Sequence, residues 1–259
     1  MGVSRSRLAG EHRPQLVRLL LLHGAGLGGR AWEGLLPHWP AGWEILAPDL
    51  PGHMGVAPPE PATLAGLEDW LAHELRRTEP TAALGWSMGS FLLQWTLARR
   101  GALGLRAAVL VNGAPARRLS TTPREVLAKR LDDHFAAPLR PVLPTLRRMA
   151  ANGWAPDAVA ALEAGVPEAD EGLLRQVRWE MFGHDFGAAA ATFPVPVLLV
   201  HGQDDSVNPV SQARWAEGAF PKAALRLVPG RHAPFASDPA TFTAAVESGL
   251  AELLAAGAA

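Results

Sequence analysis

The sequence predicts an α/β fold with a mostly parallel central sheet flanked by helices and a helical cap inserted between two core strands. Three observations support this prediction. Short apolar runs of the strand type alternate with helical patterns along the chain. These runs are apolar on both faces, as expected of buried parallel strands. One long segment between two such runs has helical patches but no convincing strand.

Six short apolar runs give the predicted strands. In chain order they are Leu16–Leu22, Trp43–Ala47, Ala82–Gly85, Ala107–Val111, Val195–Val200 and Ala224–Val228. Helices are predicted over residues 63–77, 88–100, 210–218 and 239–255. The last helix begins with Asp238 as its N-cap and Pro239 at the first helical position, where proline is favoured.

Residues 116–192 interrupt the alternation and are predicted to form the cap. Prolines divide the helical patches of this segment, at positions 123, 138, 141, 144, 156 and 167. An insertion at this end of an α/β sheet lies over the ligand crevice at the carboxyl ends of the strands. The predicted core therefore comprises residues 1–115 and 193–259. A second small helical domain with no part in function is the alternative.

Composition and charge exclude several classes of protein. The chain has 259 residues, of which 48% are hydrophobic, which is enough for the buried core of one α/β unit. Lysine and arginine number 24 against 25 acidic residues, so the basic excess typical of a nucleic-acid-binding protein is missing. The sequence contains no cysteine, which excludes disulfides and thiolate metal sites.

The N-terminal residues carry no recognisable targeting segment. They are basic but lack the apolar stretch of a secretory signal. The apolar run Leu19–Leu22 is far shorter than the roughly 20 residues that a membrane-spanning helix requires. We therefore expect a cytoplasmic monomer that does not enter a membrane.

A G-x-S-x-G motif lies between a predicted strand and a predicted helix and reads Gly85-Trp86-Ser87-Met88-Gly89. In this context the motif describes a tight turn, in which the flanking glycines allow close backbone approach. The turn would hold the Ser87 hydroxyl above the sheet at a helix N-terminus, where the helix dipole favours developing negative charge. We predict that Ser87 is a catalytic nucleophile. An ordinary serine in a glycine-rich turn is the alternative.

A serine hydroxyl is a weak nucleophile until a neighbouring base takes its proton. After a strand–serine–helix turn of this kind, an acid and then a histidine follow along the chain. Four histidines lie C-terminal to Ser87, namely His134, His184, His201 and His232. The first two fall in the predicted cap, and His201 ends a strand, where it can satisfy a local turn. His232 lies between the last strand and the last helix, and we predict that it is the base.

The acid is expected after a late strand. The strand that ends at Val111 is followed by NGAP, which contains no carboxylate. The loop after the next strand reads HGQDDSVNP over residues 201–209 and contains two carboxylates, those of Asp204 and Asp205. The positions of its glycine and proline favour Asp205, with Asp204 as the alternative. The acid would fix the tautomer of His232 and stabilise the imidazolium that forms during attack.

A glycine-rich loop, HGAGLGG over residues 23–29, follows the first strand. It matches neither GxxxxGK(S/T) nor GxGxxG, so it is not predicted to bind phosphate. It fits an oxyanion loop instead, in which the backbone N–H groups of Ala25 and Met88 would bind the developing oxyanion. His23 is expected to brace this loop, and a catalytic role for it is the alternative.

Six motifs in order resemble the α/β-hydrolase superfamily. They are LLLLHGAG, DLPGHMG, GWSMGS, VNGAP, HGQDDSVNP and GRHAPFASDPATF. Within the superfamily, the sequence looks like the BioH family, the pimeloyl-[acyl-carrier protein] methyl ester esterases of biotin synthesis. The resemblance implies the α/β-hydrolase fold and cleavage of that methyl ester with release of methanol, without a metal or an organic cofactor. The chain has Ala25 where the family commonly has tryptophan, and Met88 where it has leucine.

The two halves of the predicted cap carry opposite charge. Residues 117–150 contain eight basic and three acidic residues, whereas residues 151–190 contain two basic and seven acidic residues. Acyl carrier proteins are acidic, so the basic half could steer one toward the site. Cap arginines have this role in the family that the sequence resembles, and the candidates here are Arg140, Arg147 and Arg148. The alternative is that the two halves pair with each other or are solvated.

The remaining candidates concern the substrate. Trp86, Leu146 and Met149 are candidate walls of an acyl pocket, although the last two are equally compatible with an ordinary cap core. The motifs together predict a serine carboxylic-ester hydrolase with a Ser-His-Asp triad and an acyl-enzyme intermediate. A general short-chain carboxylesterase is the main alternative. A carbon–carbon bond hydrolase and a non-catalytic binding protein are further alternatives, although Ser87, Asp205 and His232 together argue against the latter.

Overall fold

A single parallel sheet forms the centre of the protein. The computed structural model describes residues 17–113, 169–184 and 186–257. In this part of the chain, six strands pair in the order β2-β1-β3-β4-β5-β6, and every pair is parallel. They are β1 (Arg18–Leu22), β2 (Glu44–Leu46), β3 (Ala82–Trp86), β4 (Ala107–Val111), β5 (Val197–Gly202) and β6 (Ala223–Val228). The sheet confirms the predicted fold class.

Helices flank the sheet and connect its strands. The described helices are η1 (Gly29–His38), α1 (Leu64–Thr78), α2 (Met88–Arg100), α6 (Glu171–Gly183), α7 (Phe186–Ala190), α8 (Val210–Ala219), α9 (Pro234–Ser237) and α10 (Pro239–Ala256). The four helices predicted from periodicity correspond to α1, α2, α8 and α10, within one or two residues at each end. The side chain of Asp238 caps α10 by accepting the Thr241 N–H, as the sequence suggests.

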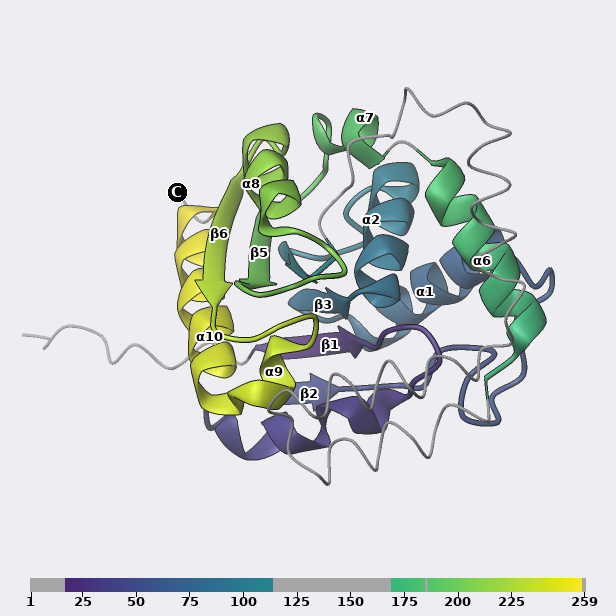
Figure 1. Ribbon diagram of the computed structural model, residues 1–259, viewed down its shortest axis with the longest axis horizontal. Coiled ribbons are helices and arrows are strands. Elements are labelled where there is room, and N and C mark those ends of the chain that lie inside the picture. The colour runs from purple at the N-terminus through teal and green to yellow at the C-terminus, as the bar shows by residue number, and fades with distance from the viewer. Residues whose placement is uncertain (1–16, 114–168, 185, 258–259) are drawn as a thin grey trace, which may run out of the picture.

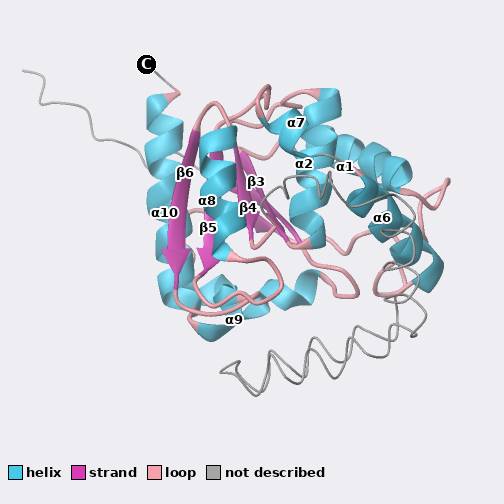
Figure 2. Cartoon of the chain, turned by 45° about the horizontal axis from the view of Figure 1, so that its top comes forward, coloured by secondary structure: helices cyan, strands magenta, loops and turns pink. Residues whose placement is uncertain are grey.

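Alternating residues of the strands pack into two separate hydrophobic layers, one on each face of the sheet. Leu20 and Leu22 of β1 face the layer that includes α1, α2 and α8, whereas Leu19 and Leu21 face the layer that includes η1 and α10. The same period of two runs through β3, β4 and β5. Figures 1 and 2 show helices on both sides of the sheet, with α10 against β5 and β6. Burial of both faces explains why the central strands β3, β4 and β5 are almost entirely apolar, whereas the partly buried edge strands β2 and β6 each contain a charged residue.

Outside the predicted cap, two described elements were not predicted, η1 and the short helix α9. The 3-10 helix η1 follows the glycine-rich loop and contains Pro37. Its apolar residues Trp32, Leu35 and Leu36 do have the i, i+3, i+4 spacing of a helix, but the segment is short, follows a glycine-rich loop and ends at a proline, and no helix was predicted there. It buries Trp32 and Leu35 against the α10 layer.

The predicted cap is described only in its last part. Within residues 116–192, the structure describes 169–184 and 186–192, which contain α6 and α7. Leu173 and Leu174 of α6 belong to the same hydrophobic layer as α1 and α2, and α6 lies against α1 (Figure 1). The Asp170 N–H donates to the Gly52 carbonyl at 2.7 Å, which ties this part to the loop after β2. Whether 116–192 acts as a cap stays a prediction.

The carboxyl ends of five strands converge at one edge of the sheet. Because all the strands run in the same direction, the residues that follow β1, β3, β4, β5 and β6 meet there. The strand order also reverses between β1 and β3, and ligands of open α/β sheets bind at such a position. The predicted functional residues follow these strands.

Candidate active site

Ser87 sits in a sharp turn between β3 and α2. Its backbone has φ 52° and ψ −114°, a strained conformation for a residue with a side chain. A Cβ at Gly85 would meet the Gly89 backbone, and one at Gly89 would meet the carbonyl oxygen of Leu22. Only glycine fits at these two positions, which explains the spacing of the G-x-S-x-G motif. The turn places Ser87 immediately before the N-terminus of α2.

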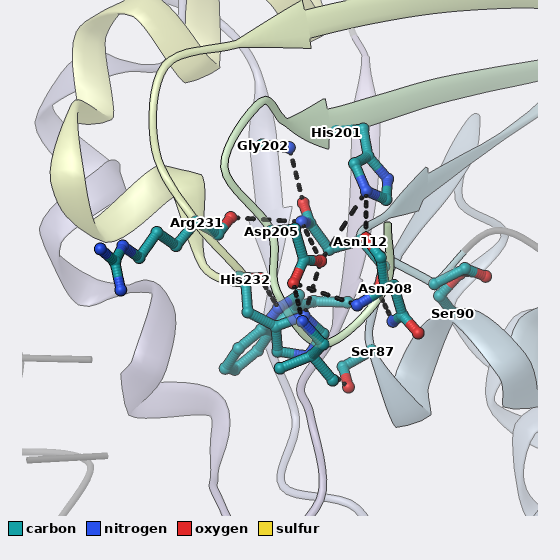
Figure 3. Close-up of polar contacts among 12 residues, drawn as sticks. Ser87, Ser90, Asn112, His201, Gly202, Asp205, Asn208, Arg231 and His232 are labelled. Carbon is teal, nitrogen blue, oxygen red and sulfur yellow. Dashed lines mark hydrogen bonds and ion pairs between the residues drawn. The ribbon is translucent and has the colours of Figure 1, made fainter. Parts of the chain in front are cut away.

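His232 and Asp205 form a hydrogen-bonded chain with Ser87 (Figure 3). His232 Nε2 lies 3.0 Å from Ser87 Oγ, and His232 Nδ1 lies 2.9 Å from Asp205 Oδ2. The carboxylate can only accept, so Nδ1 carries the proton and Nε2 is free to accept the serine hydroxyl proton. The structure thus brings together the three residues predicted as nucleophile, base and acid. This arrangement can activate a serine for attack on a carbonyl group.

Asp205, and not Asp204, faces the imidazole. Asp205 is buried, whereas Asp204 is exposed. Oδ1 of Asp205 accepts the N–H groups of Val207 and Asn208 at 2.7 and 3.1 Å. Burial raises the pKa of Asp205, but hydrogen bonds and charge from His232, with further hydrogen bonds from Asn112 and Val207, outweigh burial and hold the pKa below its usual value. The Asp205 side chain is therefore ionised at neutral pH.

His201 and His184, two of the alternative bases, have other contacts. His201 Nε2 donates to the Asn208 carbonyl at 2.8 Å, across the loop that carries Asp205. Burial lowers the pKa of His201, so that the ring is neutral and acts as a brace for this loop. His184 follows α6 and packs edge-on against Trp95, with ring centroids 4.6 Å apart. His134 lies outside the described residues.

The glycine-rich loop lies beside the nucleophile. A Cβ at Gly24 would stand 3.5 Å from the Ser87 Cβ, so the loop and the nucleophile turn are in contact range. Met88 is the first residue of α2, and its N–H is one of those that a helix cannot satisfy internally. Ala25 follows Gly24 and is partly buried. These positions are compatible with the predicted oxyanion donors, whose role stays a prediction.

His23 braces the glycine-rich loop. Its Nδ1–H donates to the Gly24 carbonyl at 2.9 Å, and its Nε2 accepts the Leu50 N–H at 2.9 Å. Burial, followed by the neighbouring His53, lowers the pKa of His23 to about 3. The ring is therefore neutral with a fixed tautomer, and both nitrogens are engaged in holding the loop.

Trp86 links the nucleophile turn to the base. Its indole N–H donates to the backbone carbonyl of His232 at 2.7 Å, and the residue is 3% exposed. The ring packs edge-on against Phe235 and Trp32 in the α10 layer. This contact with His232 was not anticipated from the sequence, which suggested a pocket wall. A substrate contact for Trp86 stays a prediction.

Asn112 is the functional candidate that the motifs missed. It follows β4 and donates from Nδ2 to Asp205 Oδ2 at 2.6 Å (Figure 3). The signal was a polar residue directly after a fully apolar strand, which sequence reasoning treated only as a position without a carboxylate. Five further predicted residues lie outside the described part of the chain, namely Arg140, Leu146, Arg147, Arg148 and Met149.

Neither a metal site nor a membrane-spanning helix is found in the described residues. Over 17–113, 169–184 and 186–257, no group of three or more histidine or acidic side chains is placed to hold a metal ion. Over the same ranges, no helix is long and apolar enough to cross a membrane.

Comparison with known proteins defines the class. Residues 19–246 match the alpha/beta hydrolase family, and the chain belongs to this family. The chain is 33% identical to the pimeloyl-[acyl-carrier protein] methyl ester esterase of Aromatoleum aromaticum, over 88% of this chain and 94% of that protein. It is 29% identical to the Aeromonas hydrophila protein of the same name, over 88% and 93%. A hydrolase from Pseudomonas aeruginosa has the same fold, with a TM-score of 0.73, 24% identity and coverage of 94% and 92%.

Proposed function

We propose that this carboxylic ester hydrolase cleaves the methyl ester of pimeloyl-[acyl-carrier protein] and releases methanol. The hydrogen-bonded chain from Ser87 through His232 to Asp205 is the observation that carries the proposed mechanism. The similarity to esterases named for this substrate, at 33% and 29% identity over most of the chain, supports the choice of ester.

The first half of the proposed reaction forms an acyl-enzyme. Ser87 Oγ attacks the ester carbonyl while His232 Nε2 takes the hydroxyl proton, and Asp205 stabilises the imidazolium. The N–H groups of Ala25 and Met88 bind the oxyanion of the tetrahedral intermediate. Collapse of this intermediate breaks the bond between the carbonyl carbon and the methoxy oxygen. The methoxy group takes the proton from His232 and leaves as methanol.

The second half regenerates the enzyme. Water attacks the acyl-Ser87 carbonyl as His232 takes one of its protons. The second tetrahedral intermediate collapses, Ser87 recovers its proton from His232, and the free carboxylate of the pimeloyl chain leaves. In the proposal, Trp86, Leu146 and Met149 contact the acyl chain, and Arg140, Arg147 and Arg148 contact the acidic carrier protein.

The test is methanol release by the purified protein from pimeloyl methyl ester attached to the carrier protein. We expect turnover by the wild type and a loss of about 10⁴-fold or more in kcat for Ser87→Ala, because the nucleophile is removed. Growth without biotin of a strain lacking its own esterase should depend on the same serine.

A chromogenic short acyl ester serves as the comparison substrate. Efficient cleavage of that ester, with no methanol from the carrier-bound substrate, would indicate a general carboxylesterase instead. Turnover unchanged in Ser87→Ala would contradict the proposed mechanism.

A further inference from the structure

Asn112 is fixed by the sheet itself. It follows β4 directly and is fully buried. Its N–H donates to the Val200 carbonyl at 3.2 Å, which continues the pairing of β4 with β5. Its backbone has φ 45°, a left-handed conformation that asparagine adopts more readily than most residues with a side chain. The side chain therefore leaves the sheet from a rigid point.

The amide of Asn112 joins the loop of the acid to the loop of the base. Nδ2 donates to Asp205 Oδ2 at 2.6 Å and to the Arg231 carbonyl at 3.2 Å. Oδ1 accepts the Gly202 N–H at 3.2 Å. Both N–H groups of the amide thus meet acceptors, and its oxygen meets a donor, so this orientation of the amide satisfies every hydrogen bond named here. Arg231 directly precedes His232, and Figure 3 shows the amide between the two loops.

Asn112 and His232 share one carboxylate oxygen. Oδ2 of Asp205 accepts from Nδ2 of Asn112 and also lies 2.9 Å from Nδ1 of His232. The other oxygen is occupied by the N–H groups of Val207 and Asn208. A charged oxygen with two donors is fixed in direction and shares its charge between them. Removal of the amide would leave more of the charge of Oδ2 to the imidazole of His232, since the neutral ring of His201 stands farther off, with Nε2 at 3.8 Å.

We infer that Asn112 is a positioning residue, which holds Asp205 Oδ2 against His232 and moderates the hydrogen bond between them. Asn112 acts through Asp205. The inference rests on the proposed Ser-His-Asp mechanism. It explains why a fully apolar strand ends in a buried amide at this position.

Asn112→Gly is the first test, because glycine accepts the left-handed backbone and removes only the amide. With a soluble chromogenic ester, we expect kcat to fall about 10- to 100-fold and KM to change little, as for the loss of a hydrogen bond to a charged group. The acid limb of kcat/KM against pH should move to higher pH, because the carboxylate then holds the imidazolium proton more tightly.

Asn112→Asp is the second test and keeps the size of the side chain. It brings a second carboxylate against Asp205 Oδ2, and the added negative charge should also move the acid limb to higher pH. If Asn112→Gly does not fold, this variant tests whether Asn112 acts on Asp205.

Gln94→Leu is the matched control. Gln94 is a buried amide of α2 that reaches the residue after Asn112, and it donates to the carbonyls of Gly113 and Ser90 at 2.7 and 3.0 Å. Its loss should lower the melting temperature and leave the acid limb unmoved.

The low-field proton signal of His232 Nδ1–H gives a readout that does not depend on turnover. The signal is assigned by its loss in His232→Gln, and we expect it to shift in both Asn112 variants. An unmoved acid limb together with an unshifted signal in a folded variant would overturn the inference. A wild type that hydrolyses no ester would contradict the proposed function instead, and the proton signal would still test the role of Asn112.

Discussion

His232 has three hydrogen bonds, two at its imidazole and one at its backbone carbonyl. Nδ1 contacts Asp205, Nε2 contacts Ser87, and the backbone carbonyl accepts the indole N–H of Trp86. The first two contacts belong to the proposed chemistry. The third fixes the backbone that carries the ring, and it comes from the residue that precedes the nucleophile. The position of the base is thereby tied to the turn that positions the nucleophile.

Trp86→Phe removes this third contact and keeps an aromatic ring. We expect kcat to fall about 10- to 100-fold, because a small displacement of the base disrupts the aligned geometry. The unpaired carbonyl should also lower the free energy of unfolding by about 1–3 kcal/mol beyond the cost of the smaller ring. Steady-state kinetics and urea unfolding measure the two effects.

Trp32→Phe is the control for Trp86→Phe. Trp32 is also buried, and its indole N–H has no hydrogen-bond partner in the described part of the chain. Its replacement removes the same ring atoms without an indole hydrogen bond to His232. Equal losses of kcat in the two variants would contradict a positioning role for Trp86.

His23, which braces the glycine-rich loop, makes the stability of the protein depend on pH. Its pKa is about 3 in the folded protein, against 6.5 for the ordinary group, chiefly because it is buried. Between these values the unfolded chain takes up a proton that the folded chain does not. Stability from this residue is therefore complete above pH 6.5 and is lost as the pH falls toward 3.

We expect His23 to contribute a decrease of about 1.4 kcal/mol in the free energy of unfolding for each pH unit below 6.5. His23→Asn should remove this contribution, so that its stability falls less steeply than that of the wild type on acidification. Urea unfolding between pH 7 and pH 4 measures the two slopes, with the exposed His73→Gln as control. Equal slopes for wild type and His23→Asn would show that His23 does not cause the acid sensitivity.

At the level of elements, one buried carboxylate joins α1 to α2. Glu68 of α1 is 1% exposed. It accepts from Trp95 Nε1 at 2.6 Å and from Arg99 Nε at 2.8 Å, and it also pairs with Arg100. These partners all lie on α2, the helix that begins directly after Ser87. The contact therefore holds the nucleophile's helix to its neighbour at the end remote from the site.

Glu68→Gln should lower the free energy of unfolding by about 1–3 kcal/mol, because charged hydrogen bonds to a buried group are lost. Glu33→Gln is the comparison variant, since Glu33 pairs with Arg30 one turn away and both side chains are exposed. We expect about 0.5 kcal/mol or less there. Urea unfolding measures the loss of stability in each variant. Equal losses would mean that the contact between α1 and α2 does not add to the free energy of unfolding.

At the level of the whole molecule, the parallel sheet assembles the site. The contacts between Ser87 and His232 and between Asn112 and Asp205 span 145 and 93 residues of sequence. These residues meet because each follows the carboxyl end of a strand in one parallel sheet. The alternation of apolar runs and helical patterns predicts such a sheet, and with it the edge at which the site lies.

Prediction from the sequence was strongest where the signal is local. Short, predominantly apolar runs located all six described strands, and the G-x-S-x-G turn located Ser87 between a strand and a helix. It was weaker where the outcome depends on packing. The helix η1 is short, lies between a glycine-rich loop and a proline, and was not predicted. Asp204 and Asp205 stand side by side in one loop. The glycine and proline of this loop favour Asp205, but the contact itself depends on how the loop packs against a histidine 27 residues away.

The sequence by itself determined the positions of the strands along the chain, the nucleophile turn and the loops that carry the acid and the base, because each is encoded by residues adjacent in the chain. Only the tertiary structure decided that Asp205 faces His232, that Asn112 donates to the same carboxylate, and that the Trp86 indole holds the backbone of His232. Those contacts depend on the directions in which side chains leave three strand ends, and these directions are set when the parallel strands pack side by side.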